Sequence, residues 1–143
     1  MNSRRVGGSV PHRSGFVALA SLISLVIGIT GVAIFAIVLD LFFNGALYSI
    51  PFINLILVPL TGIAIPVGGA AVALSITHIV IAWMLWRSSK YGGVGGLVIA
   101  ATDVVSYLFL VMISQTLLFV ASPILIAGLF LISATVAGWY NLR

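Results

Sequence analysis

One long apolar run, Phe16 to Phe43, constrains this chain more than any other feature of its sequence. The run holds about 28 residues and a single charge, Asp40, near its far end. The apolar core of a cleavable signal peptide is only about 7–15 residues long, so the run predicts an uncleaved membrane span. As a helix it would extend roughly 42 Å, which exceeds the roughly 30 Å of bilayer hydrocarbon. We therefore expect this helix to tilt or to project beyond the lipid, with Asp40 at an interface.

The composition of the whole chain leads to the same class of protein. Of the 143 residues, 62% are hydrophobic and 6% are charged, and the mean hydropathy is +1.34. A soluble domain carries about 25% charged residues because its surface faces water. We predict an all-α integral membrane protein with a basic tail over residues 1–15 and one transmembrane domain over residues 16–143. The chain has no cysteine, which excludes disulfides, thiolate metal ligands and a cysteine nucleophile.

The number of spans depends on how residues 44–65 fold. This segment is largely apolar but contains Pro51 and Pro59, and proline disrupts the interior of a helix. It is either an outer-face segment between the first and second spans or a span of its own over residues 46–64. The first alternative gives an antiparallel bundle of four helices, with spans over residues 16–43, 66–86, 94–115 and 117–140.

The basic side chains favour four spans. With four spans, all six lie on one side of the membrane: Arg4, Arg5, Arg13, Arg87, Lys90 and Arg143. With five spans, they divide three and three. Because cytoplasmic loops carry an excess of Lys and Arg, we predict four spans with both termini cytoplasmic.

The net charge of +4 also bears on the partners of the chain. At membrane borders, basic residues bind acidic lipid or a neighbouring subunit, so nucleic acid is not an expected partner. The residues assigned to lipid or partner contact are Arg4, Arg5, Arg13, Arg87 and Lys90. Trp and Tyr rings prefer the same borders, and several would lie near the inner one: Trp83, Trp86, Tyr91, Trp139 and Tyr140.

The second and third spans each carry one ionisable residue far from their ends, His78 and Asp103. His78 lies eight residues before Trp86, or roughly 12 Å from the inner border, and Asp103 lies nine residues after Val94, or roughly 13 Å from it. Antiparallel helices joined by a short loop would hold the two side chains at matching depth, where they meet if both face the same seam. An intramembrane charge costs about 2.5–3.5 kcal/mol on insertion scales, so Asp103 should have a partner.

Four further residues add hydrogen-bonding capacity near this pair: Ser75, Thr102, Ser106 and Tyr107. Burial favours the neutral form of Asp103, whereas a protonated His78 favours the ionised form. The pair is either a structural contact between helices, worth about 0.6 kcal/mol on average, or a proton-carrying pair or a polar contact for a quinone or solute. No third ligand accompanies it, so we predict no metal site and no cofactor.

The glycine run Gly92-Gly93-Val94-Gly95-Gly96 lacks the spacing of a dinucleotide fingerprint and the Lys-Ser/Thr ending of a P-loop. We expect a flexible connector that leads into a closely packed helix. Small residues four apart let helix backbones approach in lipid, and three such pairs occur: Gly96 with Ala100, Gly69 with Ala73, and Ala134 with Gly138.

These features support two functions. The first is a non-catalytic subunit of a larger membrane complex, for which a respiratory or other energy-converting complex is a host by analogy, with other subunits or copies of itself as partners. The alternative is a small proton-coupled transporter in which Asp103 and His78 carry the proton. An enzyme or quinone site centred on His78 ranks last, because no catalytic constellation stands out and a Ser–His–Asp arrangement has no support in the sequence.

Overall fold

The computed structural model describes residues 14–44, 49, 64–113, 115 and 117–143. Within these ranges the chain forms no strand and four long helices: α1 (Gly15–Phe43), α3 (Ala64–Trp86), α4 (Lys90–Ile113) and α5 (Leu117–Gly138), the last followed by the 3-10 helix η3 (Trp139–Asn141). All four are long and apolar enough to cross a membrane. The prediction of an all-helical chain with four helices of membrane-spanning length is confirmed for the described residues.

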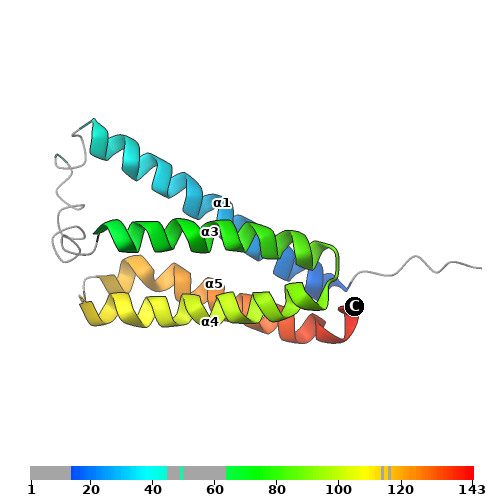
Figure 1. The fold of residues 1–143 in the computed structure, drawn as a ribbon. Coiled ribbons are helices and arrows are strands. Elements are labelled where there is room, and N and C mark those ends of the chain that lie inside the picture. The colour runs from blue at the N-terminus through cyan, green and yellow to red at the C-terminus, as the bar shows by residue number, and fades with distance from the viewer. Residues whose placement is uncertain (1–13, 45–48, 50–63, 114, 116) are drawn as a thin grey trace, which may run out of the picture.

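Consecutive helices lie side by side and alternate in direction (Figure 1). Contacts between α1 and α3 follow the same order, because Ser21 bonds to Ala82 whereas Ser24, one turn later, bonds to His78. The end of α1 and the start of α3 therefore lie at the same end of the bundle. The expected proline-containing outer segment and the alternative fifth span lie outside the described residues, apart from positions 44, 49, 64 and 65. The tail over residues 1–13, with Arg4, Arg5 and Arg13, lies outside them as well.

The buried side chains concentrate in the half of the bundle nearest the C-terminus. Fully or almost fully buried members of this core include Val17, Ala20, Leu85, Ala100 and Leu131. On α1, the described side chains after residue 28 are half-buried or exposed. Figure 1 shows the reason: α1 (blue to cyan) separates from the other helices towards its C-terminal end. Among the described residues, the half of the bundle nearest the C-terminus therefore has the packing that a buried polar site needs.

Small residues at a spacing of three or four explain why the first half of α1 packs closely on α3. Ser21, Ser24, Gly28 and Gly31 recur at the helical period and place a narrow stripe on one face of α1. A Cβ added at Gly28 would lie 2.7 Å from the carbonyl oxygen of Ser75, and one at Gly31 would collide with Ser75 Oγ. The two backbones thus approach at a distance that only glycine permits.

The glycine run is helical, so the expected flexible connector is wrong. α4 begins at Lys90, about one turn earlier than predicted, and includes all of these glycines. A Cβ at Gly92 would lie 2.8 Å from the backbone nitrogen of Leu85 on α3, and one at Gly96 would lie 3.4 Å from Thr135 Oγ1 on α5. Tertiary contacts with two other helices therefore compensate for the low helix propensity of glycine.

α3 ends in a hydrogen-bonded turn that directs the chain straight into α4. The amide of Ser89 donates to Met84 O at 3.1 Å, and the amide of Ser88 donates to Leu85 O at 2.7 Å. Ser88 has a φ of 57°, the left-handed conformation that this pattern of C-terminal bonds requires. The short turn brings α3 and α4 together as neighbours, which determines the relative depth of residues on the two helices.

Candidate functional site: a buried histidine–aspartate pair

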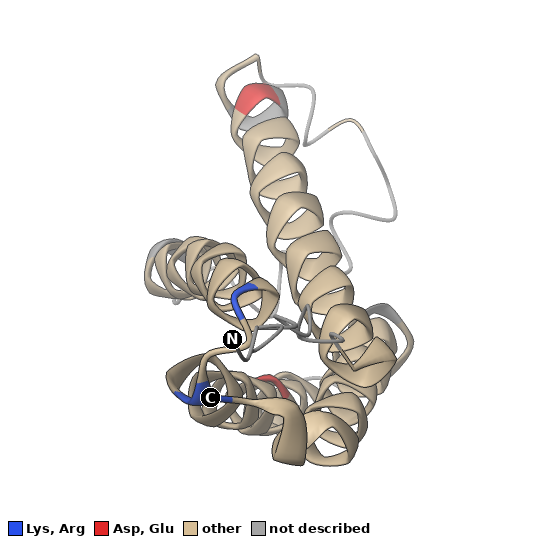
Figure 2. Ribbon diagram, turned by 90° about the vertical axis from the view of Figure 1, so that its right-hand side faces the viewer, with Lys and Arg blue, Asp and Glu red and all other residues tan. Residues whose placement is uncertain are grey.

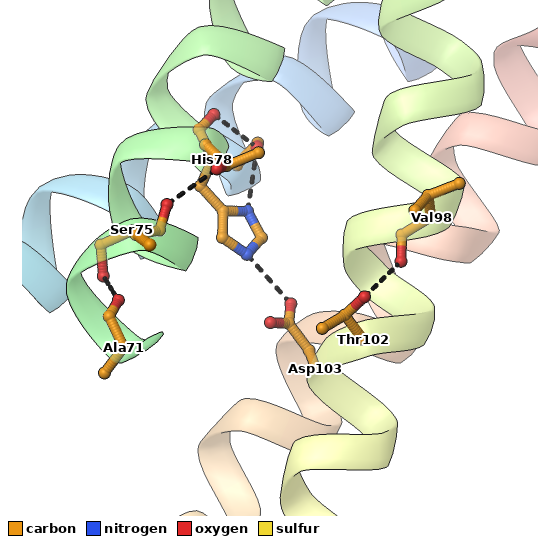
Figure 3. Close-up of polar contacts among 9 residues, drawn as sticks. Ala71, Ser75, His78, Val98, Thr102 and Asp103 are labelled. Atoms are coloured by element: carbon orange, nitrogen blue, oxygen red, sulfur yellow. Dashed lines mark hydrogen bonds and ion pairs between the residues drawn. The ribbon is translucent and has the colours of Figure 1, made fainter. Parts of the chain in front are cut away.

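His78 of α3 and Asp103 of α4 lie within hydrogen-bond distance of one another, with 3.1 Å between Nε2 and Oδ2 (Figure 3). Only 1% of the surface of His78 and 5% of that of Asp103 is exposed. Each lies on the buried stripe of its own helix, in which Ser75, Ile81, Ala82 and Leu85 accompany His78 at helical spacing. Hence the two residues share both a depth in the bundle and a seam between helices.

Ser24 of α1 joins the pair from the other side of His78. Its Oγ lies 3.1 Å from His78 Nδ1 and 2.9 Å from the carbonyl oxygen of His78, and its side chain is fully buried. Ser24 is not among the residues expected at the site from the sequence. The signal that identifies it is the stripe of small residues on α1, which marks the face that packs on α3.

The hydrogen bonds of Ser24 indicate where the protons lie. A serine hydroxyl has one proton to donate, and a carbonyl oxygen can only accept. When Ser24 donates to His78 O, its contact with Nδ1 requires that the imidazole N–H be the donor. The contact between Nε2 and Oδ2 also requires a proton, which resides on the imidazole or on the carboxyl group. In both forms the pair has no net charge.

A neutral pair agrees with the surroundings of the site. The other arrangement, in which Ser24 donates to Nδ1 and Nε2–H donates to an ionised Asp103, leaves a net negative charge among buried apolar side chains. A charge at that depth is costly in hydrocarbon. A neutral form of the pair, with one proton between Nε2 of His78 and Oδ2 of Asp103, is therefore consistent with the hydrogen bonds and with the burial of both side chains.

None of the four residues expected to support the pair is hydrogen-bonded to it in the described part of the chain. Ser75 Oγ donates to Ala71 O at 2.7 Å and Thr102 Oγ1 donates to Val98 O at 3.0 Å, each within its own helix (Figure 3). Ser106 and Tyr107 are half-buried, and in the described part of the chain no hydrogen bond joins either to Asp103. The polar partner that closes the network comes from α1 instead.

The basic residues expected at the membrane border lie away from this pair. Arg87 has its guanidinium 3.9 Å from the centre of the Trp83 ring, where a cation is attracted to the aromatic face. Lys90 is the exposed first residue of α4. Neither basic group is a partner of Asp103.

The order of Ser24, His78 and Asp103 resembles that of a hydrolase triad, but the geometry does not support acyl transfer. A nucleophilic serine must reach a substrate, whereas Ser24 is fully buried between α1 and α3. Metal chemistry has no support either, because among the described residues no group of three His, Cys, Asp or Glu side chains comes together.

Comparison of the chain with protein-family models, curated proteins and solved structures found no match. The four apolar helices indicate a small polytopic integral membrane protein. In the part of the chain that the structure describes, its distinguishing feature is a buried histidine–aspartate pair, closed by a serine hydroxyl, in the packed half of the bundle.

A double-mutant cycle on His78→Ala and Asp103→Ala tests the pair. Each single variant leaves a buried polar group without its partner and is expected to lower the free energy of unfolding by about 1–3 kcal/mol. The double variant should lose less than the sum, with a coupling of about 0.6–1.7 kcal/mol. Unfolding of the purified protein in detergent measures each value.

The matched control is a second cycle in which Thr102→Ala takes the place of Asp103→Ala. Thr102 is the neighbour of Asp103, and its hydroxyl bonds within its own helix. His78→Ala and Thr102→Ala should be additive within about 0.5 kcal/mol. Equal coupling in both cycles would mean that the contact between His78 and Asp103 contributes nothing specific.

Proposed function

We propose that this chain is a non-catalytic subunit that packs against other membrane helices, either of a larger complex or of further copies of itself. The observation that carries the proposal is an exposed stripe of small residues on α3, centred on Gly69 and Ala73. In lipid, such stripes allow backbones to approach closely, and helix association depends on that packing because there is no hydrophobic force between helices.

The three pairs of small residues in the sequence differ in their use. Gly96 and Ala100 are buried in the α4 seam, and Gly138 lies against α1, where an added Cβ would be 3.1 Å from the backbone nitrogen of Val17. By contrast, Gly69 and Ala73 are exposed, and a Cβ added at Gly69 would have no atom of another described helix within 4 Å. Among the described residues, this pair therefore has the geometry of a helix contact without a helix against it.

Thr77 extends the exposed stripe by one further turn. Its hydroxyl donates to Ala73 O at 2.7 Å, so the face presents no unsatisfied polar group to lipid or to a neighbouring helix. Gly69 and His78 are nine residues apart, which is two and a half turns and places them on opposite sides of α3. In a packing subunit, the contact between His78 and Asp103 holds α3 against α4. The small-residue stripe on the opposite side of α3 consequently faces away from the bundle.

The proposed membrane orientation places both termini in the cytoplasm. Its support is that Arg87, Lys90 and Arg143 lie at the turn between α3 and α4 and at the C-terminus, whereas Asp40 lies in the last turn of α1, at the other end of the bundle. Figure 2 shows Lys and Arg (blue) near the C-terminus. Asp40 is exposed there and accepts a hydrogen bond from Asn44 Nδ2 at 3.1 Å. The basic residues at one end match the excess of Lys and Arg expected at a cytoplasmic border, a rule to which acidic residues contribute little.

A second function, proton-coupled transport, is favoured by the shared proton of His78 and Asp103. A transporter must bind and release a proton inside the membrane. Each of these steps changes the net charge of the pair by one, and the partner side chain beside the titrating group limits the cost of that charge in hydrocarbon. The two functions differ in one respect: transport needs a route from this proton to water, whereas a packing subunit does not.

Cysteine labelling tests the orientation, because the chain has no cysteine of its own. We expect Asn44→Cys to react with a membrane-impermeant maleimide added outside intact cells, and Lys90→Cys to react only after permeabilisation. Both residues are exposed and lie at opposite ends of the bundle. Labelling of Lys90→Cys from outside would reverse the proposed topology.

Assembly is tested by Gly69→Leu and Ala73→Leu, which replace small side chains of the stripe with large ones. We expect the co-purified partner or second copy to be lost from the chain extracted in mild detergent, as measured by native mass spectrometry. Ala101→Leu is the matched control, because Ala101 is an exposed alanine on α4 outside the stripe. A wild-type chain that is always monomeric and alone after extraction contradicts the proposal.

Transport is tested by Asp103→Asn, which removes the acid and keeps the size of the side chain. Proteoliposomes with an entrapped pH-sensitive dye report proton entry with and without a panel of small solutes outside. A transporter should show solute-dependent proton entry that falls at least about tenfold in Asp103→Asn, since one positioned acid can contribute 10²–10⁴-fold to proton transfer. The neighbouring Thr102→Val should retain it, and absence of such entry in the wild-type protein rejects this function.

A further inference from the structure

An open groove lies where α4, α5 and η3 meet, and its lining does not include His78 or Asp103. Leu97 of α4, Val136 of α5, and Trp139 and Tyr140 of η3 line it, and its volume is about 250 Å³. Most of this lining is apolar, and Tyr140 is almost completely exposed. The groove therefore opens on the surface that meets the bilayer.

Backbone contacts hold the walls of this groove in place. The amide of Lys90 donates to Arg143 O and the amide of Arg143 donates to Ser88 O, both at 2.8 Å, which ties the C-terminal segment to the turn between α3 and α4. Gly93 allows this segment to lie on α4, because a Cβ there would be 3.1 Å from Trp139 Cζ3 and would collide with Leu142. The groove is thus formed by a fixed element rather than by a free chain end.

Basic residues lie at the same end of the bundle as the groove. Lys90 precedes Leu97 by seven residues, which places both on one face of α4 with roughly 10.5 Å between them along the axis. Arg143 is exposed beside it, and Arg87 contacts Trp83 on α3. In the described part of the chain, Asp40 lies at the other end of the bundle and Asp103 is buried, so no acidic side chain offsets this charge.

We propose that the groove binds one acyl chain of an anionic phospholipid, whose phosphate lies against Lys90 and Arg143. The apolar lining fits hydrocarbon, and the basic residues lie two helical turns nearer the membrane border, where the phosphate of the same lipid would be. Trp139 and Tyr140 are residue types that prefer the level of the headgroups. Basic sites between transmembrane helices on the cytoplasmic side bind anionic headgroups, so charge selects the lipid class.

Native mass spectrometry of the intact purified chain tests this site. The probes are phosphatidylglycerol and phosphatidylcholine with identical acyl chains, added to the delipidated protein in detergent. We expect one phosphatidylglycerol to bind per chain in preference to phosphatidylcholine. Lys90→Gln should weaken its binding roughly fivefold, the contribution expected of one basic residue at a membrane surface.

A substitution that fills the groove distinguishes binding of the acyl chain from electrostatic attraction of the headgroup alone. Val136→Trp should reduce binding of phosphatidylglycerol, whereas Val98→Trp, at an exposed position of α4 outside the lining, should not. Circular dichroism establishes that both variants remain helical. Equal binding of the two lipids, or equal effects of the two tryptophan variants, would overturn the proposal. The measurement uses the isolated chain, so its result is independent of whether the chain is a subunit or a transporter.

Discussion

The hydrogen bond between His78 and Asp103 is the interaction on which the rest of this bundle depends. It connects α3 to α4, and Ser24 extends it to α1. Apolar side chains gain little by leaving lipid for one another, so a membrane bundle has few forces that specify which helix faces meet. A buried polar group is one of them, because it must find its partner. The pair therefore does more to fix the arrangement of the helices than its modest net energy implies.

Glycine and serine residues let the neighbouring helices approach closely enough to bury the His78–Asp103 pair. Gly128 of α5 lies against Asp103, where an added Cβ would be 3.4 Å from Asp103 Cβ and 3.2 Å from Ala100 O. On the other side, Gly28 brings α1 onto α3 and Ser24 onto His78. The same small residues that allow close helix packing thus exclude lipid and water from the polar site. Gly69 and Ala73 have this property on an exposed face, which is why the proposed partner contact is placed there.

A structural pair and a proton-carrying pair have the same geometry but differ in access to water. Ser24, His78 and Asp103 are all buried within the described structure, and their hydrogen bonds are made to one another and to the backbone. That closure suits a contact that holds helices together. It is the physical reason for placing the subunit function before the transporter function.

Hydropathy and helical rise determined the class of fold and the depth of the site. The apolar segments allow four or five spans, and the one-sided distribution of Lys and Arg favours four. A rise of 1.5 Å per residue from the turn near Lys90 places His78 and Asp103 at one level. The low helix propensity of glycine led to the wrong prediction of a connector at Gly92–Gly96. These residues are helical because they pack against α3 and α5. Propensity describes one segment, and this helix start is stabilised by others.

Tertiary structure alone decided which faces meet. The depth of a residue follows from its own helix, but rotation about the axis depends on what every neighbouring helix buries. Hence the sequence placed His78 and Asp103 at one depth without showing that they touch, and it did not select Ser24, which lies 54 residues before His78. For the same reason, identical small-residue patterns at Gly96 and Gly69 have opposite outcomes. One is packed and the other is exposed, because only the folded bundle specifies where a second helix lies.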